Sequence, residues 1–144
     1  MMITIKREGD EWVPEVDLTP DLVRECTLEP KEILDRIKAA GIVGMGGATF
    51  PTHVKLSVPP GKKTEFLIIN GVECEPYLTS DHRTMLEKGE ELMVGTTILM
   101  RVLGVKQAQI GIENNKPDAI AFLRELSKHY EGVRVTPLKV RYPQ

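Results

Sequence analysis

The feature that most constrains the fold is an alternation of short apolar runs with longer amphipathic stretches in the second half of the chain. The apolar runs cover residues 64–69, 107–113 and 133–140, and each has the length and composition of a buried strand. Between them, the spacing of apolar residues predicts helices over residues 80–103 and from residue 117 onward. Connections of the type strand–helix–strand are right-handed and join parallel strands. This order of elements therefore predicts an α/β fold with a mostly parallel sheet.

A glycine-rich stretch precedes the first of these strands. Gly44, Gly46 and Gly47 lie close together, and glycines permit positive φ angles and let a ligand approach bare amide groups. Lys55 follows shortly after, and a glycine turn followed by a basic residue suits an anionic ligand such as a phosphate. The spacing matches neither the dinucleotide-binding fingerprint nor the P-loop. A tight turn between two packed elements would explain the stretch equally well.

Polar side chains follow the first two predicted strands. Asn70, Glu73 and Glu75 come directly after the first strand, and residues 113–115 end the second. In an extended segment the two glutamates would share a face, while Cys74 would point the other way. Open α/β sheets bind ligands at the carboxyl ends of their strands. We therefore expect both clusters at one edge of the sheet, with the glycine-rich stretch beside them.

The first part of the chain is predicted to be an arm followed by short helices. Residues 1–17 form the arm, in which the alternation over residues 3–5 is typical of an edge strand and Trp12 is expected to anchor the arm on the domain. A short helix is predicted over residues 19–26, which begin with Thr-Pro-Asp. A second helix is predicted over residues 30–40, because a glycine suited to a C-cap follows it.

Composition excludes several classes of protein. The net charge is −2 and no basic tract is present, so a nucleic-acid partner is not expected. The chain has no apolar run long enough to span a membrane and no signal-peptide pattern. Its two cysteines and three scattered histidines have no metal-ligand spacing, so no metal site is predicted within the chain. Two widely separated thiols fit a reducing, cytoplasmic environment.

Three segments together resemble a known family. Residues 41–55, 70–77 and 111–117 are similar, in order and spacing, to the C subunit of the bacterial Rnf ion-translocating electron-transport complex. That family is related to the NADH-binding flavoprotein subunit of respiratory complex I. The resemblance implies a Rossmann-like three-layer sandwich preceded by a short helical and glycine-loop region. Residues 18–144 would be a partial flavin/NADH-binding domain of the complex I type, truncated at its C-terminus. The [4Fe-4S] clusters of the family would lie only in a region beyond this chain.

The same resemblance implies FMN and NAD(H) as cofactors. Gly46 and Gly47 would turn backbone amides toward the flavin phosphate or the nucleotide, and Lys55 would add positive charge. Asn70 would contact the flavin, the two glutamates would lie near the flavin and nicotinamide, and two asparagines would lie near a third contact region. The implied cofactor-binding residues are Gly44, Gly46, Gly47, Lys55, Asn70, Glu73, Glu75, Asn114 and Asn115.

Some positions depart from the complex I pattern. Met45, Thr49 and Val72 stand where that pattern has an arginine, a glycine and an aspartate. These changes leave the pose of the nucleotide open. No side chains form a convincing nucleophile or acid–base pair, so no catalytic residue is predicted.

The implied function is electron transfer. Hydride would pass between NADH and the flavin, and electrons would continue to iron–sulfur centres elsewhere in a membrane ion-translocating oxidoreductase complex. The other subunits of the Rnf complex would be its partners, at the cytoplasmic face of the bacterial inner membrane, where this chain would be peripheral. The isolated fragment is expected to be inactive. The alternative is a non-catalytic assembly or nucleotide-binding module of the same complex, which would keep the fold without turnover.

Overall fold

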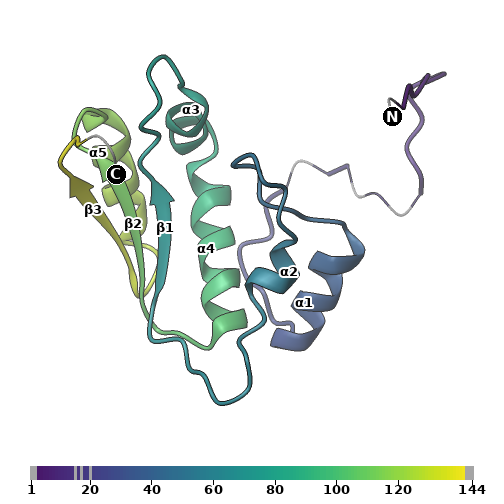
Figure 1. Ribbon diagram of the computed structural model, residues 1–144, viewed down its shortest axis with the longest axis horizontal. Coiled ribbons are helices and arrows are strands. Elements are labelled where there is room, and N and C mark those ends of the chain that lie inside the picture. Colours follow the sequence, from purple (N-terminus) through teal and green to yellow (C-terminus); the bar gives the residue numbers. More distant parts are fainter. Residues whose placement is uncertain (1–2, 15, 17, 20, 142–144) are drawn as a thin grey trace.

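The computed structural model describes residues 3–14, 16, 18–19 and 21–141. It consists of an extended N-terminal arm and a body of helices and strands (Figure 1). The elements of the body, in chain order, are α1 (Pro30–Ala39), α2 (Thr52–Lys55), β1 (Leu67–Gly71), α3 (Ser80–Glu87), α4 (Gly89–Leu103), β2 (Ala108–Glu113), α5 (Pro117–Ser127) and β3 (Val133–Leu138).

The three strands form one parallel sheet in the order β1-β2-β3. Its register aligns Ile69 with Ile110 and Ile110 with Val135. The helices α3 and α4 connect β1 to β2, and α5 connects β2 to β3. The predicted α/β class, the parallel sheet and the order of the elements are confirmed.

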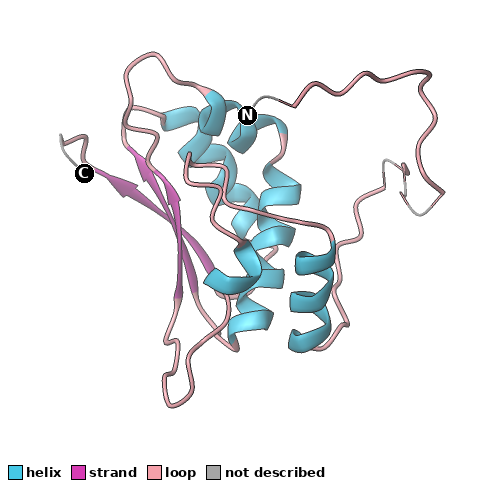
Figure 2. Ribbon diagram, turned by 45° about the vertical axis from the view of Figure 1, so that its right-hand side comes forward, coloured by secondary structure: helices cyan, strands magenta, loops and turns pink. Residues whose placement is uncertain are grey.

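Alternating burial separates the two faces of the sheet. Ile110 and Ile112 of β2 are fully buried against the helices, whereas Ile68 of β1 is 65% exposed and Arg134 of β3 is also exposed. Figure 2 shows the helices gathered on one side of the sheet. The described residues therefore supply two of the three layers that the resemblance implies.

Methionine and aliphatic side chains fill the core between the sheet and α3, α4 and α5. Met85 and Met93 come from α3 and α4, and Leu123 comes from α5; all three are at most 2% exposed. Burial of this apolar surface is the main stabilising contribution of such a layer. The core residues are Met85, Met93, Met100, Val105, Ala108, Ile110, Ile112, Ala119, Ile120, Leu123, Val133 and Val135.

The helix predicted over residues 80–103 is divided into two. Lys88, with φ −128° and ψ 31°, separates α3 from α4. A Cβ atom on Gly89 would lie 2.6 Å from the Phe122 ring of α5, so only glycine fits at the first position of α4 in this packing. Gly104 ends α4 in the left-handed conformation, as expected for a C-cap glycine.

The helix α1 packs against both α2 and α4. Its predicted C-terminus is confirmed, because Gly41 follows it with a φ of +65°. The short helix predicted over residues 19–26 is wrong, because residues 21–26 are irregular. This segment buries little, with Val23 77% exposed, and the Arg101 guanidinium donates to the carbonyls that follow, those of Thr27 (3.2 Å) and Leu28 (2.6 Å).

The arm runs away from the body (Figure 1). No strand forms over residues 3–14, and Ile3 and Ile5 are 74% and 87% exposed. Trp12 is 63% exposed, so it does not anchor the arm on the body. The predictions of an edge strand and of an anchoring tryptophan are therefore wrong, because no apolar surface of the body covers these side chains.

Candidate functional site

The carboxyl end of β1, the last residue of β3 and the glycine-rich loop border one pocket of about 520 Å³, which also touches the middle of β2 at Gly111. Gly46, Asn70, Glu73 and Glu75 line it together with Cys74. The floor is apolar and is formed by Ile68, Ile69, Gly111 and Leu138. The structure thus brings the glycine loop and the first strand-end cluster together, as the sequence predicted.

The other candidate residues do not line this pocket, so the asparagines at the end of β2 are not part of it. Gly44 and Lys55 line an adjoining pocket of about 200 Å³ that also contains Gly46. Asn115 lines a third pocket, of about 260 Å³, on the far side of the β1–α3 connection. Asn114 is exposed, and its backbone N–H donates to the Leu138 carbonyl at 2.8 Å.

The glycine loop is closed at its base by backbone pairing. Val43 and Pro51 form an antiparallel bridge, and the Gly44 N–H donates to the Phe50 carbonyl at 2.8 Å. Gly47 has a φ of +108° and Thr49 a φ of +49°. A Cβ atom on Gly44 would lie 3.1 Å from the Lys55 Nζ, so the ammonium group lies across the base of the loop. The loop residues and the Lys55 side chain therefore border the same small pocket.

The segment after β1 is a turn rather than an extended strand. The Asn70 Oδ1 accepts a hydrogen bond from the Val72 N–H at 3.1 Å, as in an Asx-turn. Glu73 adopts a φ of +49°, and its carboxylate accepts from the backbone N–H groups of Asp81 (2.5 Å) and His82 (3.0 Å). The expectation that Glu73 and Glu75 share an extended face is therefore wrong. The free N–H groups at the start of α3 attract one carboxylate and turn the chain.

Cys74 also differs from its expected position. Its Sγ atom lies 3.9 Å from the Glu75 Oε2, and both side chains border the pocket. The two residues are therefore on the same side of the turn, because the chain is no longer extended.

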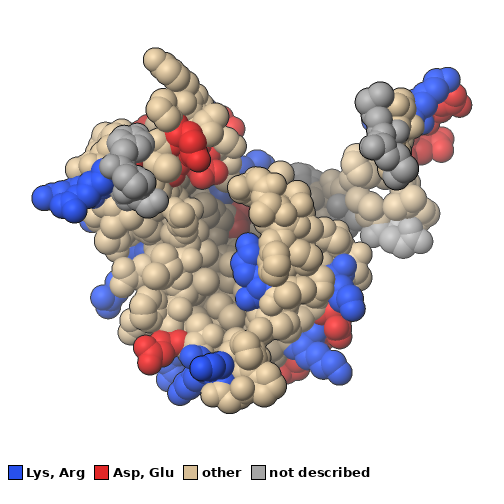
Figure 3. Space-filling model, in the orientation of Figure 1, with Lys and Arg blue, Asp and Glu red and all other residues tan. Residues whose placement is uncertain are grey.

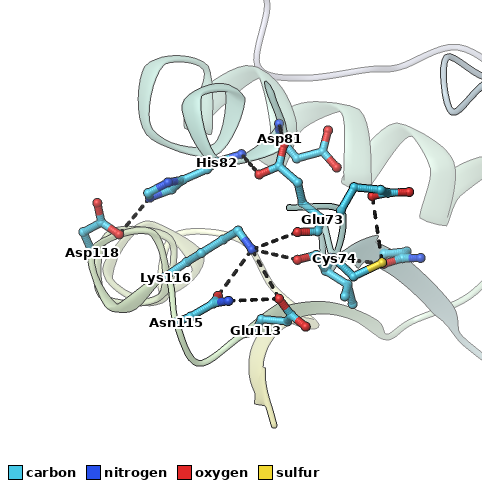
Figure 4. Close-up of polar contacts among 11 residues, drawn as sticks. Glu73, Cys74, Asp81, His82, Glu113, Asn115, Lys116 and Asp118 are labelled. Carbon is cyan, nitrogen blue, oxygen red and sulfur yellow. Dashed lines mark hydrogen bonds and ion pairs between the residues drawn. The ribbon is translucent and has the colours of Figure 1, made fainter. Parts of the chain in front are cut away.

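Glu113, from the second strand-end cluster, is joined at this site by Lys116, which the sequence did not single out (Figure 4). Glu113, at the end of β2, is 0% exposed, and Lys116 is 7% exposed. The Lys116 Nζ donates to the Val72 carbonyl at 2.8 Å and lies 3.6 Å from the Glu113 Oε2. An acid and a base three positions apart, directly after a buried strand, are the sequence signal that could have indicated them.

Carboxylates dominate the electrostatics of the pocket. The pKa of Asp81 is raised, first by burial and then by the Glu73 carboxylate; the Lys116 charge opposes this shift, and the Glu75 carboxylate adds a smaller contribution to it. Figure 3 shows acidic side chains gathered near the β1–α3 connection on this face. A negatively charged ligand would therefore find its favourable charges at the glycine loop rather than at this edge.

A histidine connects the first turns of α3 and α5. The His82 Nε2 lies 2.9 Å from the Asp118 Oδ1, and this hydrogen bond lowers the pKa of Asp118, with a further contribution from the Ala119 N–H. Among the residues that the structure describes, no group of three or more His, Cys, Asp or Glu side chains is placed to hold a metal ion. In the same residues, no helix has both the length and the apolar character needed to cross a membrane.

A parallel sheet with a pocket beside the carboxyl end of β1 is the arrangement found in ligand-binding domains of the open α/β class. Residues 37–144 match the family model of the Nuo51 FMN-binding domain, and the chain belongs to this family.

Curated relatives point to the same group of proteins. The chain is 49% identical, over 99% of its length, to the C subunit of the proton-translocating ferredoxin:NAD⁺ oxidoreductase complex of Clostridium ljungdahlii. It is also 49% identical, over its whole length, to the C subunit of the Na⁺-translocating complex of Acetobacterium woodii. The predicted resemblance to Rnf C subunits is confirmed. The chain spans 30% and 32% of the length of these two relatives.

A solved structure supports the fold. An NAD⁺-reducing [NiFe]-hydrogenase in its H₂-reduced state matches with a TM-score of 0.60 and 24% sequence identity, covering 79% of this chain and 22% of the hydrogenase chain. At this level of identity the match shows the fold alone, and it confirms the Rossmann-like α/β assignment.

Proposed function

We propose that this chain is the FMN- and NAD(H)-binding part of an ion-translocating ferredoxin:NAD⁺ oxidoreductase subunit. The observation that supports the proposal most directly is the convergence of the glycine loop and the β1 end on one pocket of about 520 Å³. This volume is in the range of small-molecule and cofactor sites. Membership of the Nuo51 FMN-binding domain family indicates which cofactor would occupy it.

The residues present fit a phosphate-bearing flavin. The amides of Gly46 and Gly47 and the Lys55 ammonium would hold the phosphate, because a glycine-rich turn beside a cation suits an anionic group. Asn70 and Glu75 would face the ring system from the end of β1. Asn114 and Asn115 would contact the bound cofactors from the end of β2. Glu73 would border the flavin while its carboxylate remains bound to α3.

Bound FMN would supply the conversion between two-electron and one-electron transfer. The chain's own contribution is binding, orientation and charge. Because Asp81, Glu73 and Glu75 lie together, their field would oppose a further negative charge in the pocket. We also propose the remaining parts of the function: contact with the other members of the complex at the cytoplasmic face of the membrane, and electron transfer to iron–sulfur clusters outside this chain.

The test is a pair of FMN titrations followed by flavin fluorescence. One sample is this chain and the other is the full-length subunit. Binding by the full-length subunit supports the proposal, and binding by the chain as well would show that the loop and the Asn70 turn suffice. If neither sample binds FMN, with or without NADH, the proposal fails and a non-catalytic assembly module becomes the better description.

A further inference from the structure

A lysine from one strand end reaches across to the other strand end. Lys116 lies in the turn between β2 and α5, and its Nζ donates to the backbone carbonyls of Val72 (2.8 Å) and Glu73 (3.4 Å) in the turn after β1. These residues are more than 40 positions apart in the sequence. An ammonium group has three donors, so one side chain can hold two successive peptide groups and still reach a third partner.

The positive charge of this lysine is compensated locally (Figure 4). The Lys116 Nζ lies 3.6 Å from the Glu113 Oε2 and 3.4 Å from the Asn115 Oδ1. The Asn115 Nδ2 donates to the same Glu113 oxygen at 3.1 Å. Lys116 and Glu113 are 7% and 0% exposed, and burying charged groups in this way is costly unless they are paired. A pair that is buried at this cost is therefore expected to have a structural role in the site rather than to serve surface solubility.

The turn that Lys116 holds is conformationally strained. Glu73 has a φ of +49°, a left-handed conformation that is unfavourable for a residue with a side chain. Its carboxylate is fixed by the N-terminus of α3, and its carbonyl, with that of Val72, is fixed by Lys116. The next residues, Cys74 and Glu75, border the 520 Å³ pocket. The direction in which Cys74 and Glu75 enter the pocket therefore depends on the contact of Glu73 with α3 and on the contact of the turn with Lys116.

We propose that Lys116 is a positioning residue for the cofactor pocket. It holds the turn at residues 72–73 through its backbone carbonyls, and so sets the placement of Asn70, Cys74 and Glu75. Glu113 supplies the charge that allows Lys116 to remain buried. This inference rests on the proposed function, and Lys116 itself would act without touching the cofactor.

The experiment uses the full-length subunit and three variants. Lys116→Met removes the ammonium group. The double variant Glu113→Gln with Lys116→Met also removes the opposing charge, and Lys128→Met, which loses only an exposed pair with Glu125, is the matched control. Three quantities are measured for each: the melting temperature, the Kd for FMN with the visible circular dichroism of the bound flavin, and hydrogen exchange of peptides covering residues 72–79.

We expect Lys116→Met to weaken FMN binding by about tenfold or more, equivalent to about 1.4 kcal/mol, because the turn would no longer hold Asn70 and Glu75 in place. Its flavin dichroism should change, and exchange should rise in residues 72–79 more than elsewhere. The double variant should recover most of the melting temperature but neither the Kd nor the dichroism. Lys128→Met should resemble the wild type in all three.

Two results would overturn the proposal. Recovery of both the melting temperature and the Kd in the double variant would mean that Lys116 only balances the Glu113 charge. Wild-type FMN binding and unchanged local exchange in Lys116→Met would mean that the turn does not depend on it. If the wild-type subunit binds no FMN, the proposed function fails, and the exchange at residues 72–79 alone then decides whether Lys116 holds the turn.

Discussion

The pocket has two walls that are built by different means. The glycine loop is held by backbone pairing between Val43 and Pro51, and its residues are mostly exposed. The opposite wall, the turn after β1, is held by side chains: the buried pair of Lys116 and Glu113 and the Glu73 carboxylate. The comparison teaches that substitutions should act differently on the two sides. Changes in the loop should alter binding with limited loss of stability, whereas changes in the turn's support should alter both.

The largest effect is expected from Glu113→Ala. Removing this carboxylate leaves the Lys116 ammonium without its nearby countercharge, and breaking a buried pair in this way costs roughly 3–5 kcal/mol in the free energy of unfolding. Urea denaturation of the variant and the wild type measures this loss. The matched control is Glu125→Ala, which removes an exposed partner of Lys128 and should leave the denaturation midpoint nearly unchanged. Similar midpoints for the two variants would show that the second wall does not depend on buried charge.

A smaller effect, confined to binding, is expected from Lys55→Met. Hydrogen bonds to charged groups contribute about 1.5–3 kcal/mol, so FMN binding should weaken by at least about tenfold while the melting temperature changes little. Riboflavin, which lacks the phosphate, should bind the variant and the wild type equally. Lys62→Met in the neighbouring surface loop is the control. Equal losses for FMN and riboflavin would mean that Lys55 does not act on the phosphate.

The third prediction concerns the backbone of the loop. Gly47→Ala places a side chain at a φ of +108°, with no atom within 4 Å of the added Cβ, so only backbone strain of about 1–2 kcal/mol is introduced. Thr49→Gly makes the opposite change at a φ of +49°, where relief of strain is offset by the entropy of the more flexible unfolded chain. Thermal denaturation should show a loss for the first and almost no change for the second. A clear loss in Thr49→Gly would indicate that the threonine side chain itself supports the loop.

The smallest effect is expected from Asp81→Asn and depends on pH. The pKa of Asp81 is raised in the folded protein by burial and by neighbouring carboxylates. Its ionised form therefore opposes folding at neutral pH, and this cost disappears as the pH falls through the raised pKa toward the ordinary value of 3.8. The variant should be slightly more stable than the wild type at pH 7 and equal to it below about pH 4. Chemical denaturation at both pH values tests this, and a variant that is less stable at pH 7 would contradict it.

Much of the body could be predicted from the sequence because its signals are local. The apolar runs and the glycines that end α1 and α4 determine the elements and their order, and the parallel sheet follows from the handedness of the connections. The division at Lys88 was not predictable in this way. It coincides with the close approach of Gly89 to Phe122, two residues that are brought together only by the tertiary packing of α4 and α5.

The candidate site also has some features that could be predicted from the sequence and others that could not. That the glycine loop and the Asn70 turn would meet followed from the expectation that open α/β sheets bind ligands at the carboxyl ends of their strands, where both ligand-contacting segments would have to lie. The conformation of Glu73 did not follow, because its carboxylate is attracted by the N-terminus of a helix that begins seven residues later. The role of Lys116 was missed for a similar reason. Its partners, the carbonyls of Val72 and Glu73, carry no sequence signal at all.

The bend at Lys88 lets α3 and α4 run in different directions. The helix α4 must lie along the sheet, where Met93 and Met100 are buried, whereas α3 must aim its first turn at Glu73. If α3 and α4 were one straight helix, a change in the direction of α3 would force the same change in α4. Because the two helices are separate, the direction of the capping turn is not tied to the direction of α4, and α3 is joined to the core through its own buried Met85.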